Sequence, residues 1–376
     1  MDSVIRGREE IAQQNLRSLF ERRGFRRVSV PKFEDYDLYI DNKNFLGSEH
    51  IITFMDMDGK LRALKPDVTL SIVKNMPGKA LQSFEKLYYV DEIYRLSREN
   101  REYKVLDQIG VELIGPADDF SNIEIVDLAL ESLALIGERY VLDISHIGLV
   151  SGLLEESGIS HSSGIKILDA IHSKSAHNLR GILEEEGVSE RGKADILALA
   201  ELHGPLSRML PQLKELIRSP QMEEAYRELA HLAEVLNGGE AGSRVNLDFS
   251  VVGDLDYYNG LVFAGYVQGV PTEVLSGGRY DNLMKKMGKA SCALGFGVYL
   301  TELGVYQKGE VHSDFDILLT YPQECDHGAL LAAVRKLTAE GNRVRTEREN
   351  VAADKLGFTY DRRFRFENNT LTEIIV

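Results

Sequence analysis

The feature that most constrains the fold is the stretch of residues 86–115, KLYYVDEIYRLSRENREYKVLDQIGVELIG, which has two β-rich segments joined by a charged loop. Side chains alternate between the two faces of a strand. Gln108 and Glu112 therefore share a face, about 13 Å apart at roughly 3.3 Å per residue. Gly110 lies between them and has no side chain. We predict a strand pair with a polar shelf that is open above Gly110 to a small molecule.

Arg95 brings a positive charge to the same shelf. It follows Tyr89, Asp91 and Ile93 at a spacing of two residues, so it should share their face of the first strand. The same residues also fit an ordinary half-exposed strand pair with solvated polar side chains. Other segments of the chain are needed to choose between these interpretations.

A second polar segment precedes this strand pair. Asp58 and Gly59 stand between alternating residues and predict a tight hairpin. The hairpin leads to Pro66, which favours the start of a helix. Asp67 and Thr69 would lie in the first turn of that helix, where their oxygens can cap it or bind a ligand. The residues themselves allow both roles.

Several segments resemble the class II aminoacyl-tRNA synthetases, in the histidyl-tRNA synthetase version. The segment around Pro31 is similar to the first motif of that class. Four stronger matches follow in the family's order between about residues 10 and 305, and together they are specific. They are KPDVT (65–69), Tyr94 and Arg95 with DQIGVELIG (107–115), LDYYNG (255–260), and GGRYDNL (277–283) with ALGFGVYLTEL (293–303).

The resemblance implies an α+β fold with a mostly antiparallel sheet flanked by helices. It also implies a site for histidine or a histidine-like ligand, in which Tyr258 contacts the imidazole and Glu112 accepts a ring N–H. Because Tyr257 and Tyr258 are neighbours on an expected strand, only one should face the pocket; cross-strand packing of both is the alternative. The implied site residues are Asp67, Thr69, Arg95, Gln108, Glu112, Tyr257 and Tyr258.

Three positions depart from the synthetase pattern. The family's catalytic arginine falls on Gly253, its ATP-holding arginine on Glu302, and an acidic residue that helps to hold ATP on Ser97. Adenylate formation needs cations around the triphosphate. A glutamate in place of an arginine turns attraction into repulsion, about 4 kcal/mol each way for unit charges at about 4 Å. We predict that the amino-acid pocket is retained and that activation is lost.

This combination resembles the regulatory subunit of ATP phosphoribosyltransferase, a synthetase-like family that opens histidine biosynthesis together with a short-form catalytic subunit. The resemblance implies a chain that is catalytically inert by itself, self-associates as a dimer within a hetero-octamer, and confers feedback inhibition by histidine. A divergent but active histidyl-tRNA synthetase and a standalone amino-acid sensor are the alternatives.

Composition limits the partners. The net charge of -15 in 376 residues argues against a nucleic-acid partner, which clustered Lys and Arg would bind. The sequence shows no apolar run of membrane-spanning length and no signal region, so we expect a cytoplasmic protein without a membrane partner. Cys292, Cys325 and the histidines lack metal-ligand spacing, and we expect no metal and no cofactor.

Changes in character along the chain predict three domains. Residues 1–148 and 243–307 would form the synthetase-like core, residues 149–242 a helical insertion, and residues 308–376 a small C-terminal α/β domain. Within the core we predict a helix over residues 8–24 and hairpins at Asn259–Gly260 and Gln268–Gly269. In the last domain, residues 361–369 hold several arginines mixed with acidic and aromatic residues, and fit an edge strand as well as a basic surface.

Overall fold

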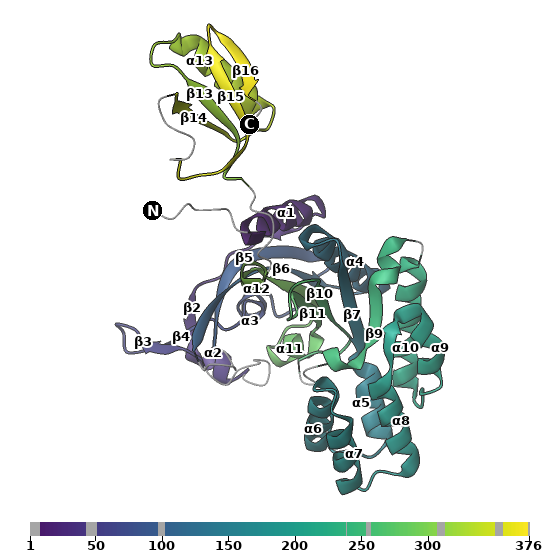
Figure 1. The fold of residues 1–376 in the computed structure, drawn as a ribbon. Coiled ribbons are helices and arrows are strands. Elements are labelled where there is room, and N and C mark those ends of the chain that lie inside the picture. Colours follow the sequence, from purple (N-terminus) through teal and green to yellow (C-terminus); the bar gives the residue numbers. More distant parts are fainter. Residues whose placement is uncertain are drawn as a thin grey trace. The chain divides into compact units, whose positions relative to one another are not determined.

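The computed structural model describes residues 8–42, 51–96, 102–237, 239–252, 257–306, 313–349 and 356–374. Contacts divide the chain into a larger unit, Ala12–Gln307, and a smaller unit that contains Lys308–Val376 (Figure 1). The predicted division into a core, a helical insertion and a C-terminal domain stays a prediction.

A nine-stranded sheet organises the larger unit (Figure 1). Its neighbours are antiparallel except for the β1–β5 and β7–β9 pairs, which confirms the predicted mostly antiparallel sheet. In spatial order the strands are β1 (Arg26–Arg27), β5 (Glu85–Leu96), β6 (Tyr103–Gly115), β12 (Cys292–Tyr299), β11 (Leu275–Arg279), β10 (Leu261–Val267), β7 (Tyr140–His146), β9 (Val245–Asp248) and β8 (His203–Pro205).

Alternation along β5 and β6 separates the two faces of this sheet. Tyr88 and Val111 belong to the core beneath α1 (Arg8–Arg22) and α4 (Asp119–Ile136). Tyr89 and Ile114 belong to a second core, which includes residues of α3 (Thr69–Lys74). The predicted first helix is thus α1, and Gly24 follows it at φ 83°. Gln108 and Glu112 lie on the face of Ile114, so the polar shelf faces α3.

A three-stranded sheet leads the chain to α3. Its order is β2 (Phe33–Asp35), β4 (Leu61–Leu64) and β3 (Thr53–Met55), and α2 (Tyr36–Ile40) follows β2. Asp58 and Gly59 connect β3 to β4, with Gly59 at φ 77°, which confirms the predicted hairpin. The positive φ explains why glycine stands there.

Residues 149–242 are mainly helical, as expected. Their hydrophobic side chains belong to the same core as the sheet. The strand β8 lies between α8 and α9 and forms an edge of the nine-stranded sheet, which the sequence interpretation missed. The helices are α5 (Ile147–Glu156), α6 (His161–His172), α7 (Ala176–Glu185), α8 (Glu190–Glu201), α9 (Leu206–Lys214) and α10 (Pro220–Leu236), with short 3-10 helices η2 (Glu240–Arg244) and η3 (Phe249–Val251) after them.

The smaller unit is a four-stranded sheet with one helix among its described residues. Its strand order is β14 (Val344–Arg348), β13 (Phe315–Tyr321), β15 (Tyr360–Glu367) and β16 (Thr370–Ile374), and α13 (His327–Ala339) connects β13 to β14. Ile317, Leu337 and Phe366 form its core. The edge-strand interpretation of residues 361–369 is wrong, because β16 pairs with β15 on the side away from β13.

The two predicted turns around β10 have different outcomes. Gln268 and Gly269 lie between β10 and β11, which pair as a hairpin, as predicted. The hairpin at Asn259 and Gly260 is wrong: β10 pairs with β7 and β11, and β9 pairs with β7 and β8. Asn259 instead accepts a hydrogen bond from the backbone N–H of Asp281.

Two short helices complete the larger unit, α11 (Asp281–Lys286) after β11 and α12 (Leu300–Tyr306) after β12. Among the residues that the structure describes, no helix combines the length and the apolar character that a membrane span requires.

Candidate functional site

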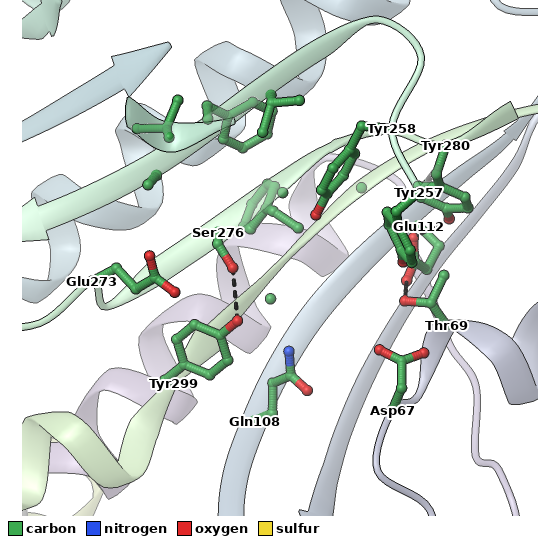
Figure 2. Close-up of a pocket in the computed structure, with 18 of the residues that line it drawn as sticks. Asp67, Thr69, Gln108, Glu112, Tyr257, Tyr258, Glu273, Ser276, Tyr280 and Tyr299 are labelled. Carbon is green, nitrogen blue, oxygen red and sulfur yellow. Dashed lines mark hydrogen bonds between the residues drawn. The ribbon is translucent and has the colours of Figure 1, made fainter. Parts of the chain in front are cut away.

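A cavity of about 520 Å³ opens on the face of the sheet that carries Gln108 and Glu112 (Figure 2). This volume lies in the range of small-molecule sites. All seven site residues predicted from the sequence line it: Asp67, Thr69, Arg95, Gln108, Glu112, Tyr257 and Tyr258. Further lining residues, which the sequence interpretation missed, include Tyr89, Asp169, His172, Glu273, Ser276, Tyr280 and Tyr299.

Glu112 occupies one end of the cavity and is 2% exposed. One of its oxygens accepts a hydrogen bond from Thr69 Oγ1 at 2.7 Å, and the other accepts one from the Tyr280 hydroxyl. Burial raises the pKa of Glu112 to about 8, against the opposing effect of these two hydrogen bonds. The carboxyl group is therefore mostly protonated at neutral pH.

Asp67 and Thr69 take different roles. Asp67 Oδ1 accepts a hydrogen bond from the backbone N–H of Leu70 at 2.9 Å, so Asp67 caps the first turn of α3. The hydroxyl of Thr69 instead donates a hydrogen bond to Glu112. Burial raises the pKa of Asp67, and the nearby charge of Arg95 opposes this rise. Both oxygen-bearing side chains still line the cavity, so capping and ligand contact are compatible at Asp67.

Arg95 supplies positive charge to the cavity wall. Its Nε donates to the carbonyl of Pro66 at 2.9 Å, and its guanidinium lies 4.0 Å from Asp67. Among the described residues that line the cavity, Arg95 is the one arginine or lysine. The carboxyl groups of Asp67, Asp169, Glu112 and Glu273 line the same space, so the wall carries more acidic than basic groups.

Gln108 points into the cavity without a hydrogen-bond partner for its side chain among the described residues (Figure 2). It is 7% exposed, so its amide is available to a ligand but barely to solvent. Two glycines on β12 leave room for these polar side chains. A Cβ at Gly297 would lie 1.9 Å from Gln108 Nε2, and one at Gly295 would lie 2.2 Å from Glu112 Oε2.

The predicted opening above Gly110 is wrong. A Cβ at this position would lie 2.4 Å from the hydroxyl oxygen of Tyr89, so the phenol of Tyr89 fills the space. Tyr89 follows the same period-two face as Arg95 on β5. The sequence placed it on this face, but its direction across to β6 could not be read from spacing.

Tyr257 and Tyr258 both line the cavity, which corrects the expectation that only one would. The alternation argument fails because β10 begins only at Leu261. Their rings pack edge to face with centroids 4.5 Å apart, and the ring of Tyr280 lies 5.8 Å from that of Tyr257. The aromatic packing is therefore present, although not across strands, and contact of either tyrosine with a ligand stays a prediction.

Of the three residues that depart from the synthetase pattern, the structure describes one. Gly253 and Ser97 lie outside the described residues. Glu302 lies in α12 and accepts a hydrogen bond from Thr272 Oγ1 at 3.2 Å, away from the residues that line the cavity.

Arg279, the cation of the GGRYDNL segment, is engaged elsewhere. It forms an ion pair with Asp281 at 2.8 Å. Asp281 also accepts hydrogen bonds from Asn259 and from the backbone of Ala293. Arg279 therefore holds the loop together and does not replace a lost cation in the cavity.

Metal binding finds no support among the described residues, which contain no cluster of three or more His, Cys, Asp or Glu side chains that could hold an ion. His146 accepts a hydrogen bond from the backbone N–H of Gly148 and lies 3.3 Å from Glu228. His146 thus caps the start of α5 at the end of β7.

Comparisons with known proteins agree with this geometry. Residues 5–303 match the family model described as histidyl-tRNA synthetase. An ATP phosphoribosyltransferase regulatory subunit from Geobacter metallireducens is 31% identical over 288 residues, 75% of this chain and 66% of that protein. The chain thus spans just under two thirds of that relative's length.

Two further proteins show the range of this similarity. A histidine–tRNA ligase from Methanocaldococcus jannaschii is 28% identical over 294 residues, 77% of this chain and 69% of that one. A solved structure from Bacillus halodurans, described as an ATP phosphoribosyltransferase regulatory subunit/histidyl-tRNA synthetase, has a TM-score of 0.75 at 23% identity and shares the fold over 93% of this chain and 90% of that one. The chain belongs to the histidyl-tRNA synthetase family, and its relatives there include proteins named as ATP phosphoribosyltransferase regulatory subunits.

Proposed function

We propose that this chain is a regulatory subunit of ATP phosphoribosyltransferase that binds histidine and has no catalytic activity by itself. With a short-form catalytic subunit it supports the first step of histidine biosynthesis, in the cytoplasm, and its feedback inhibition by histidine. The observation that carries the proposal is the composition of the cavity. It combines the residues expected to bind histidine with a single arginine and no lysine among its described lining residues.

Histidine fits the polar groups of the cavity. In this proposal the α-amino group binds near Asp67, the carboxylate binds the Gln108 amide and Arg95, and the imidazole lies at the end formed by Glu112 and the tyrosines. Each of these groups lines the same cavity. The Gln108 amide supports the assignment, because it lines the cavity and makes no hydrogen bond to the described chain, so it is free to bond a ligand.

The absence of activation chemistry follows from charge. Adenylate formation requires cations that hold the triphosphate and stabilise the charge developing at its α-phosphorus. Among the described lining residues Arg95 stands against the carboxyl groups of Asp67, Asp169 and Glu273, with Glu112 mostly protonated. Outside the lining, Glu302 falls where the resemblance places a family arginine. We therefore propose that the chain neither activates histidine nor requires a cofactor.

The relative's name supports the choice of partner. The Geobacter protein is named as a regulatory subunit of ATP phosphoribosyltransferase, and we propose a short-form catalytic subunit of that enzyme as the partner here. We further propose self-association as a dimer within a hetero-octamer. Co-expression followed by light scattering of the purified complex tests both statements, and two species that migrate separately at all concentrations would contradict them.

The ligand is tested by isothermal titration of histidine into the wild-type chain and a Gln108→Leu variant. The Gln108 side chain makes no hydrogen bond to the described chain, so the variant should fold normally and bind histidine about tenfold more weakly or worse. Gln212→Leu is the matched control, because Gln212 is exposed on α9. Equal affinity of wild type and Gln108→Leu would contradict the assignment of the pocket.

Catalysis is tested by histidine-dependent pyrophosphate exchange. The expected result is no exchange above a blank, whereas exchange together with charging of histidine tRNA would establish the alternative, an active histidyl-tRNA synthetase. The Methanocaldococcus relative's name is the observation that favours this alternative. A standalone histidine sensor would bind the ligand but form no complex with a phosphoribosyltransferase.

A further inference from the structure

Lys65 is a completely buried lysine just before the segment that carries Asp67 and Thr69. Its side chain is 0% exposed, and its Nζ lies 2.5 Å from Asp91 Oδ1 on β5. The side chain of Asp91 is 13% exposed, so both charges are largely removed from water. Neither residue lines the cavity.

A gain in folding stability does not by itself explain why a buried lysine and aspartate are paired here. Removing two charges from water carries a desolvation cost that offsets much of their attraction, and apolar residues of similar volume are often at least as stabilising. The pair does, however, fix the relative position of the two segments. If one charge moves away, the other is left buried without a partner, which raises the free energy of the folded chain. The ion pair therefore restrains the backbone around Lys65 relative to β5.

The backbone of this segment crosses from the small sheet to the large one at Lys65. Its N–H donates to the carbonyl of Lys32, beside the small sheet, at 3.3 Å. Its carbonyl accepts from the N–H of Tyr94 on β5 at 3.0 Å, and the next carbonyl, of Pro66, accepts from Arg95 Nε at 2.9 Å. The Lys65–Asp91 ion pair thus lies where the backbone of the segment that begins at Lys65 bonds to the backbone of β5.

We propose that Lys65 is a positioning residue for the ligand pocket, which through its ion pair with Asp91 holds residues 65–69 on β5 so that Asp67 and Thr69 face the cavity. The inference rests on the proposed function for the identity of the ligand. It extends that function to a residue that does not touch the ligand.

The test compares Lys65→Met, which keeps most of the side-chain volume, with Lys65→Arg, which keeps the charge. Lys32→Met is the matched control, because Lys32 pairs with Glu92 at 2.8 Å but its side chain is 57% exposed. Hydrogen–deuterium exchange on the ligand-free chain reports the segment directly, and isothermal titration reports histidine affinity. Lys65→Met should speed exchange of the amides of residues 67–70 and weaken affinity, each by about tenfold or more.

Lys65→Arg and Lys32→Met should stay close to wild type in both measurements. Local exchange and affinity unchanged in Lys65→Met would overturn the inference. So would faster exchange spread evenly over Ala12–Gln307, because that result indicates a general structural role. If Lys65→Met does not fold, Asp91→Asn gives the same expectations, and an unchanged segment in that variant also overturns the proposal.

The two proposals can fail separately. If the wild-type chain binds no histidine, the proposed function fails. The exchange measurement then still decides whether Lys65 holds the segment, because it is made without ligand.

Discussion

Replacement of Glu112 by Gln tests the electrostatics of the cavity most directly. Glutamine has nearly the same shape, and the hydroxyls of Thr69 and Tyr280 can each donate or accept, so both hydrogen bonds can be kept. The substitution therefore removes a titratable group while leaving the packing in place. Any change in the pH dependence of stability then reports the carboxyl group itself.

The sign follows from the direction of the shift. Burial raises the pKa of Glu112 from 4.5 to about 8, so between these values the folded chain binds a proton that the unfolded chain has released. The free energy of unfolding contributed by this group falls as pH rises through that window, by about 1.4 kcal/mol per pH unit. Below pH 4.5 the contribution of Glu112 to the free energy of unfolding no longer changes with pH. Above about pH 8 the carboxyl group is ionised in both states, and its destabilising effect has reached its full size.

The assay is urea unfolding of wild type and Glu112→Gln at pH 6 and pH 7.5. The stability of the variant relative to wild type should increase by about 2 kcal/mol between these two pH values. Comparing the two proteins cancels the pH dependence of all other groups that titrate alike in both. A difference that stays constant, or that shrinks as pH rises, would refute the assignment of a protonated Glu112.

Three further outcomes are expected. Gly297→Ala should weaken histidine binding about tenfold in titration calorimetry, because the new Cβ displaces Gln108; unchanged affinity would contradict this. Gly181→Ala should raise the free energy of unfolding by about 1 kcal/mol, since this position in α7 has open space around it, and a loss of stability would be the opposing result. Asp281→Ala should lower the free energy of unfolding by about 3 kcal/mol, because Arg279 loses its partner, and a change within 0.5 kcal/mol, about the size of a surface substitution, would show that the pair is dispensable.

The polar shelf could be predicted because its information is local. Period two along one strand is enough to put Gln108 and Glu112 on a common face, and the order of the motifs brings Asp67 and Thr69 to it. The partner of Thr69 could not be predicted in this way. Its hydroxyl bonds to Glu112, 43 residues later in the chain, and only the packing of α3 against β6 brings the two together.

Two glycines of β12 could have indicated from the sequence that large side chains cross this strand, but the sequence interpretation did not use them. Gly295 and Gly297 are two residues apart, so they share a face of the strand, and the register places Gly295 opposite Glu112. Two residues without side chains on one face of a central strand indicate that something large occupies the space. Here it is filled by Glu112 and Gln108. The same reasoning applies at Gly110, where the large neighbour is Tyr89, and it explains why the predicted opening to a ligand is closed.

We propose that the charge balance of the cavity lets it bind an amino acid and exclude a nucleotide. A zwitterion needs one acceptor for its ammonium group and one donor set for its carboxylate, and we propose that Asp67 and Arg95 with Gln108, which all line the cavity, provide them. A triphosphate instead brings several negative charges towards Asp169 and Glu273, both exposed on the cavity wall. Each unit charge held at about 4 Å from such a carboxylate costs up to about 4 kcal/mol at an effective dielectric of about 20. Among the described lining residues Arg95 is the one arginine or lysine, and a single cation does not offset two such contacts. We therefore propose that the same charge balance favours the amino acid and disfavours its activation.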